Sequence, residues 1–137
     1  MSETDLPPND CQEELPEAAV RGLEYFNAGD YFEAHEFLEA AWRAEAGPLR
    51  NLYRGVLQVA VAYYHVQHHN YAGALKLIAR LRKWLEPFPV RCQGINLARL
   101  HEDINRVEVE LLRLGPERIG HFDSAFFRPI EYYTHTF

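Results

Sequence analysis

The sequence predicts an all-α fold, a bundle of five helices built from two antiparallel helical hairpins and followed by an irregular aromatic tail. Apolar residues recur at the helical period from residue 16 to residue 114, and capping residues and Gly-Pro pairs divide that stretch into five pieces. No segment shows the apolar–polar alternation of a strand. A chain of 137 residues is long enough for one domain with a buried core.

The N-terminal part is expected to hold a lead-in and the first helix. Residues 1–14 are polar and acidic, so we expect a flexible segment ahead of a single helical domain at 15–137. Pro16 suits the first turn of a helix that runs to about Asn27, and Gly29 closes that helix.

The next two helices are expected to form the middle of the bundle. Asp30 is a suitable N-cap, with Glu33 three residues later as in a capping box, for a second helix that ends near Glu45. A third helix, at about 49–69, is apolar on nearly every face. Such a helix usually lies at the centre of a bundle, so we predict that it is the buried one.

The C-terminal half supplies two more helices and the tail. Asn70 is expected to cap a fourth helix that ends near Leu85, and Asn96 a fifth that reaches Leu114 before a Gly-Pro pair. The tail at 117–137 is rich in aromatic residues. We expect these rings to pack back over the helices, because so many exposed aromatic side chains would cause aggregation.

A short internal repeat supports the hairpin arrangement. The pattern consists of a capping residue, then a tyrosine, and then an alanine three positions after the tyrosine. It occurs at Asp30-Tyr31-x-x-Ala34 and again 40 residues later at Asn70-Tyr71-x-x-Ala74. Each copy begins a helix that follows another helix. This arrangement resembles the helical hairpins of tetratricopeptide repeats, although the rest of that consensus is missing.

Composition narrows the class of partner and the location. Residues 1–45 carry twelve acidic and two basic side chains, whereas residues 46–100 carry one acidic and eight basic. We interpret the basic part as a solvated face that complements the acidic part, and the net charge of −6 disfavours nucleic-acid binding. No apolar run reaches the roughly 18 residues of a membrane span, so we expect a cytoplasmic protein that does not enter a membrane. Cys11 and Cys92 are then expected to be free thiols.

Ionisable residues interrupt the apolar faces of the second and third helices. His35 falls in the middle of an apolar face, with Glu39 one turn further along. On the third helix Gln58 and His65 share one side of the helical wheel. If the two helices pack together, these four residues converge.

We call these four residues, His35, Glu39, Gln58 and His65, the polar seam, and three interpretations of it remain open. The first is a closed structural network in which Glu39 accepts from His35, while Gln58 and His65 satisfy one another. The second is a site for a divalent metal held by His35, Glu39 and His65, with Glu36 or Gln58 as a catalytic residue. The third is a site for an organic ligand.

A longer pattern surrounds the seam. It begins with an aromatic pair and a His-Glu-x-x-Glu-x-x-Trp motif, continues with Gly-Val-Leu-Gln-x-Ala, and ends with Tyr-His and Asn-x-x-Gly-Ala. Its residues in this chain are Phe26, Gly29, Asp30, Tyr31-Phe32, His35, Glu36, Glu39, Trp42, Arg50, Tyr53, Gly55-Val56-Leu57-Gln58, Ala60, Tyr64-His65, Asn70 and Gly73-Ala74. This pattern resembles the domain of unknown function 309 family of small all-helical proteins. Members have been labelled predicted metal-dependent hydrolases, so the resemblance implies a helical fold and that activity.

Two functions from different classes follow. The first is a non-catalytic binding or scaffold module for a protein or a small ligand, favoured by the hairpin repeat and by the absence of a complete catalytic motif. The alternative is the metal-dependent hydrolase. A helical protein with this many aromatic residues can also form a homodimer.

Overall fold

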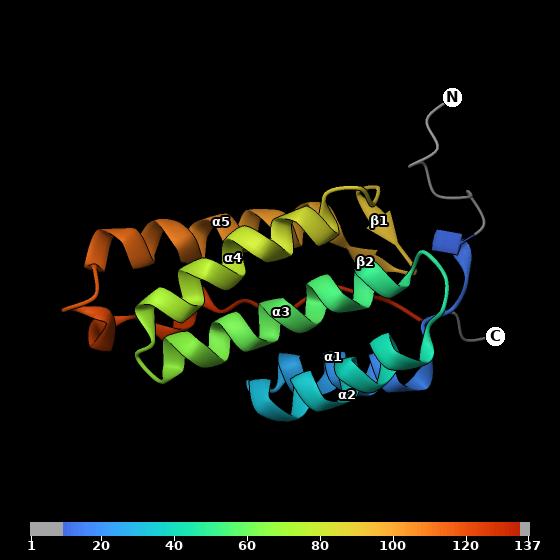
Figure 1. Cartoon of the computed structure of the whole chain (residues 1–137), viewed down its shortest axis with the longest axis horizontal. Helices are drawn as coiled ribbons and strands as arrows, with labels where there is room; N and C mark the ends of the chain where they lie inside the picture. Colours follow the sequence, from blue (N-terminus) through green and yellow to red (C-terminus); the bar gives the residue numbers. More distant parts are fainter. Residues whose placement is uncertain (1–9, 135–137) are drawn as a thin grey trace.

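The computed structural model describes residues 10–134 and contains the five expected helices (Figure 1). They are α1 (Glu17–Asn27), α2 (Tyr31–Ala44), α3 (Arg50–Gln67), α4 (Tyr71–Leu85) and α5 (Leu97–Leu114). Each begins and ends within two residues of its predicted position. The all-α fold class is therefore confirmed.

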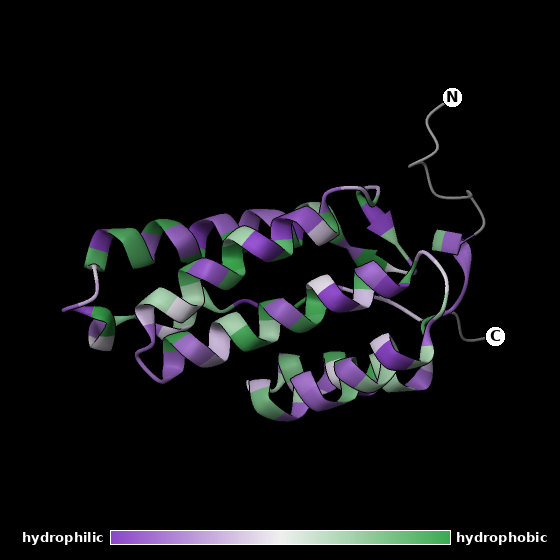
Figure 2. Ribbon diagram, viewed as in Figure 1, coloured by the Kyte–Doolittle hydropathy of each residue, from purple (hydrophilic) through white to green (hydrophobic). Residues whose placement is uncertain are grey.

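Consecutive helices pack against one another, so the first four form two hairpins side by side. Contacts join α1 to α2, α2 to α3 and α3 to α4, and α5 lies along α4 (Figure 1). Hydrophobic and hydrophilic residues are interspersed along each helix, as expected when a helix buries one side (Figure 2). The predicted central helix is α3, which buries nine residues. Within the described residues, no helix is long and apolar enough to cross a membrane.

The two copies of the repeat form the same turn. Asp30 and Asn70 cap their helices with nearly identical backbone angles, and their side chains accept from the backbone N–H groups of Glu33 and Gly73. The N–H of each capping residue also donates to a carbonyl five residues back, at 2.9 and 2.8 Å. A helix end of this type requires a left-handed residue just before the cap. Gly29 has φ 83° there in the first copy, and His69 has φ 60° in the second.

The second copy uses a residue type that is costly in this conformation, which leads to a paired prediction. A residue other than glycine costs about 1–2 kcal/mol in the left-handed region. Glycine avoids this cost, but it also gives the unfolded chain more conformational entropy, which offsets part of the gain in stability. We expect His69→Gly to raise the free energy of unfolding by roughly 0.5–1 kcal/mol, and Gly29→Ala to lower it by about 1 kcal/mol. No atom lies within 4 Å of a Cβ built on Gly29, so only backbone strain acts there. Chemical denaturation of both variants tests this, and changes of the same sign would contradict it.

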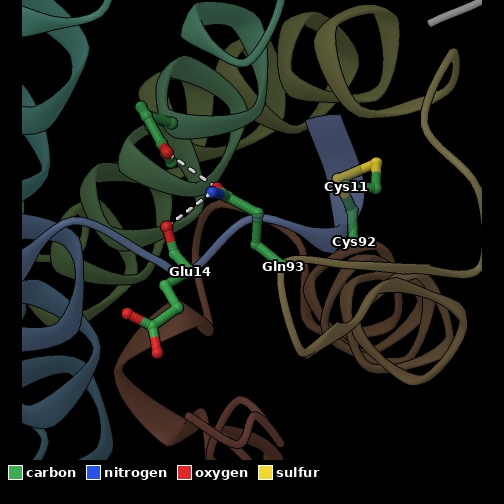
Figure 3. The surroundings of a disulfide bond; sticks show 5 residues. Cys11, Glu14, Cys92 and Gln93 are labelled. Carbon is green, nitrogen blue, oxygen red and sulfur yellow. Dashed lines mark hydrogen bonds between the residues drawn. A yellow bond between two sulfur atoms is a disulfide. The ribbon is translucent and has the colours of Figure 1, made fainter. Parts of the chain in front are cut away.

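The segment between α4 and α5 corrects two predictions. It contains a small antiparallel hairpin of β1 (Arg91–Cys92) and β2 (Ile95–Asn96), although no strand was predicted from the sequence. Cys11 and Cys92 form a disulfide rather than two free thiols (Figure 3). Their Cα atoms are 4.3 Å apart although 81 positions separate them in the sequence.

Hydrogen bonds around the disulfide hold the N-terminal segment against the hairpin. The backbone N–H of Gln93 donates to the Cys11 carbonyl at 2.6 Å. The side-chain amide of Gln93 donates to the Glu14 carbonyl at 2.9 Å (Figure 3). The Gln93 amide oxygen accepts from the Tyr53 hydroxyl on α3 at 2.7 Å. Residues 10–14, assigned by their composition to the flexible lead-in, are therefore fixed, while residues 1–9 of that lead-in lie outside the described range.

The aromatic tail folds back over the helices, as predicted. Two single-turn helices, η2 (Ile119–His121) and η3 (Ser124–Phe126), follow α5, and the chain then runs behind α3 toward α1 (Figure 1). The Phe127 ring contacts those of Tyr31 and Tyr63. Asn27 exchanges two hydrogen bonds with the backbone of Ile130, at 3.0 and 2.8 Å. Residues 135–137 of the predicted tail are not among those described.

Candidate functional site

The α2–α3 groove contains the two histidines that the sequence predicted to converge. We use this name for the cavity of about 150 Å³ lined by Tyr31, Phe32, His35, Val61, Tyr64 and His65. Four of these six residues are aromatic or aliphatic, and two of the four, Tyr31 and Tyr64, also carry a phenol hydroxyl. His35 and His65 supply the imidazole groups, one from each helix. The periodicity of the two helices therefore placed these residues correctly.

His35 is only partly buried, although its position in the middle of an apolar face predicted a buried imidazole. Its side chain is 26% exposed. Neighbouring helices cover Ala34, Leu38 and Ala41 of α2, and His35 lies at the edge of that covered face. Its Nδ1 atom is 3.1 Å from the backbone carbonyl of Phe32. A carbonyl can only accept, so Nδ1 carries the hydrogen and Nε2 keeps a free lone pair.

Two carboxylates accompany His35 on the same helix. The His35 Nε2 atom is 3.6 Å from a Glu39 oxygen, and its Nδ1 atom is 3.7 Å from a Glu36 oxygen. In the described part of the chain, His35, Glu36 and Glu39 form a group whose candidate ligand atoms all lie within 4.8 Å of one another. Glu39 also pairs with Arg43. His65 is not a member of this group.

His65 makes a different hydrogen bond from the predicted one. The N–H of Gly73 donates to the Asn70 side-chain oxygen at 2.9 Å, which directs the Asn70 NH₂ group toward His65 Nδ1 at 3.2 Å. An NH₂ group donates, so Nδ1 of His65 is the acceptor and Nε2 carries the hydrogen. His65 is thus bonded to the cap of α4 and not to Gln58.

Gln58 remains without the expected partner. Its side-chain oxygen is buried and makes no hydrogen bond to any described residue. The Trp42 indole N–H is likewise buried and unpaired within the described chain. The closed network of four seam residues is therefore wrong. The Arg54 guanidinium lies over the rings of Trp42 and Trp84, at 5.6 and 4.0 Å from their centroids.

Sequence reasoning missed a second polar cluster, in the core beneath the tail. Asp103 of α5 is 2% exposed, with Arg128 at 3.7 Å and Arg99 at 3.9 Å. Burial raises the pKa of Asp103 against the opposing effect of these guanidinium groups, and burial also raises the pKa of the nearby Tyr63 hydroxyl. The sequence did contain an indication of this cluster, because Asp103 falls on the same apolar face of α5 as Leu100.

Fold and site define a class of protein, a stack of helical hairpins with a histidine-lined groove between its second and third helices. The family model described as "Domain of unknown function (DUF309)" matches residues 19–77. That match contains α1, α2, α3 and the start of α4. Over these residues the chain matches the DUF309 family model, in agreement with the resemblance.

Two uncharacterised bacterial proteins are similar to this chain. The "Uncharacterized protein YpuF" of Bacillus subtilis (strain 168) is 44% identical over 66 residues, which cover 47% of this chain and 38% of YpuF. An "Uncharacterized protein" of Aquifex aeolicus (strain VF5) is 26% identical over 96 residues, covering 69% of this chain and 27% of that protein. The chain therefore spans less than half of either relative. Neither their names nor the family description states an activity.

Proposed function

We propose that the chain is a non-catalytic binding module and that the α2–α3 groove is its ligand surface. The observation that carries this proposal is the groove itself, a cavity with mostly apolar walls and two imidazole groups. Ligand pockets are commonly apolar with a few polar groups that orient the ligand. One copy of the repeat caps the start of α2 and the other caps α4 directly after the end of α3, so a capped turn lies beside each wall of the groove.

An exposed aromatic residue at the cavity favours a protein as the ligand. The Phe32 side chain lines the cavity and is 50% exposed. Its ring lies 6.0 Å from that of Tyr64, centroid to centroid, which leaves an aromatic surface open to solvent. Exposed aromatic side chains beside a pocket often supply much of the energy of a protein interface.

A capture experiment with the full chain at native expression level tests the proposal. Val61→Phe places a ring in the cavity, whereas Leu112→Ser changes an exposed apolar side chain on α5, away from the groove. We expect the wild type and Leu112→Ser to retain the same specific partner, and Val61→Phe to lose it while keeping its helical circular dichroism. Retention of the same partner by Val61→Phe, or no specific partner with any form, would contradict the proposal.

The second candidate function is the metal-dependent hydrolase, which the group of His35, Glu36 and Glu39 favours. The free lone pair of His35 Nε2 and the Glu39 carboxylate are two suitable ligands one helical turn apart. A catalytic zinc ion usually has three protein ligands, so Glu36 or His65 has to complete the set, and Glu36 or Gln58 then remains as a catalytic residue. A bound divalent ion would supply an activated water molecule.

Metal analysis of the same purified samples separates the two functions. A stoichiometric ion in the wild type that disappears in His35→Ala supports the hydrolase. A His65→Ala variant tests whether the ligand set extends across the groove. Equal metal content in all three proteins would contradict a site at these residues.

A further inference from the structure

The two histidines of the groove hold opposite tautomers, which gives the cavity a defined hydrogen-bonding pattern. His35 donates from Nδ1 to the Phe32 carbonyl, so its Nε2 atom is an acceptor. His65 accepts at Nδ1 from Asn70, so its Nε2–H group is a donor. A ligand that satisfies both groups has to donate one hydrogen bond and accept another.

The size and walls of the cavity restrict the ligand further. Its volume is about 150 Å³, and an apolar cavity of about that size in another protein binds benzene. The rings of Phe32, Tyr64 and Tyr31 line it. Aromatic walls favour an aromatic ligand through edge-to-face and offset contacts.

We infer that the α2–α3 groove binds the side chain of an exposed tyrosine on a partner protein. The phenol oxygen accepts from the Nε2–H of His65, and the phenol hydrogen is donated to Nε2 of His35. This inference rests on the proposed binding function and specifies the chemistry of the partner.

Other side chains match the cavity less well. A carboxylate can only accept and an ammonium group can only donate, so each leaves one imidazole unsatisfied. Serine and threonine hydroxyls have the right hydrogen bonds but fill little of the volume. Phenylalanine fills the volume but leaves both imidazoles unpaired, and an unpaired polar group in a binding site lowers affinity.

The tautomers can be measured without any ligand. Nitrogen-15 NMR of the histidine rings is expected to show the His35 hydrogen on Nδ1 and the His65 hydrogen on Nε2. Finding the same tautomer in the two residues would overturn the inference, because the cavity would then not combine a donor with an acceptor.

Three capped tripeptides test the ligand. They have the form Gly-X-Gly, where X is tyrosine, phenylalanine or O-methyltyrosine, and binding is followed by NMR titration of the full chain. Two hydrogen bonds should make the tyrosine peptide bind about tenfold tighter than the phenylalanine peptide. The O-methyltyrosine peptide, which cannot donate, should bind no better than the phenylalanine peptide. Equal binding of all three peptides, or binding of none, overturns the inference.

Ring-preserving variants assign the effect to the two histidines. In His35→Phe and His65→Phe we expect the preference for tyrosine over phenylalanine to fall to about twofold or less. His101→Phe is the matched control, since His101 lines a different cavity beside Phe88 and Val90, and it should keep the full preference. A tenfold preference that survives both groove variants overturns the inference.

These results are distinguishable from failure of the proposed function. If no tyrosine preference is found but Val61→Phe still abolishes partner capture, the groove binds a partner of other chemistry and only the inference fails. If partner capture is unaffected by Val61→Phe, the proposed function fails and the inference falls with it.

Discussion

Replacing Cys11 with serine is expected to lower the free energy of unfolding by about 2–4 kcal/mol. The disulfide to Cys92 spans 81 residues, and the loss of chain entropy in a closed loop of that length corresponds to about 4.5 kcal/mol at 25 °C. Measured values are usually smaller, because the unfolded chain retains some structure. For a chain of this size, the melting temperature should fall by roughly 10 °C.

Reduction of the wild type provides the comparison. Thermal unfolding in the presence of a dithiol reductant should bring the wild type close to the Cys11→Ser variant, while the variant itself should not respond to the reductant. Cys11 is the better position for serine, because Cys92 is completely buried and a hydroxyl group there would add its own cost. A wild type that melts at the same temperature with and without reductant would refute the expectation.

The disulfide also bears on the expected location of the protein. The predicted cytoplasmic location led to the expectation of free thiols, because a reducing compartment keeps cysteine thiols reduced. The structure instead pairs Cys11 with Cys92, and disulfides persist mainly in oxidising compartments. The redox state of the two cysteines in the source cells is therefore a direct observation to make.

The helices could be predicted because their ends are determined by local chemistry. Asp30, Asn70 and Asn96 each accept a hydrogen bond from the backbone three residues later, as capping residues do. The same local rule explains the internal repeat. Helical periodicity also predicted that His35 and His65 lie close together, and both line the α2–α3 groove. The helical period fixes the direction in which each side chain leaves its helix.

Features that depend on distant parts of the chain could not be predicted in the same way. The pairing of Cys11 with Cys92 requires the path of 81 residues between them. The β1–β2 hairpin has only two residues in each strand, which is too short for an alternating pattern. The partner of His65 depends on how Gly73 orients Asn70, a choice between two rotations of an amide group that no sequence pattern encodes.

Gly55 of α3 packs against Leu85 of α4, and Gly55→Ala is expected to lower the free energy of unfolding by about 2 kcal/mol. A Cβ atom at this position would lie 2.5 and 2.6 Å from two carbon atoms of Leu85. Leu85 is completely buried and cannot move aside. Overpacking of a core costs about 1–3 kcal/mol, and the gain of up to about 1 kcal/mol in helix propensity offsets only part of a large clash.

The double variant tests the cause. Leu85→Ala alone should cost about 2–5 kcal/mol, because it leaves a cavity between the helices. In that background the methyl group of Gly55→Ala occupies part of the cavity and the alanine favours the helix, so the second substitution should stabilise the protein. The effect of Gly55→Ala therefore changes sign with residue 85. Denaturation of the four proteins measures this coupling, and additive costs would show that the close contact with Leu85 is not why glycine is needed at this position.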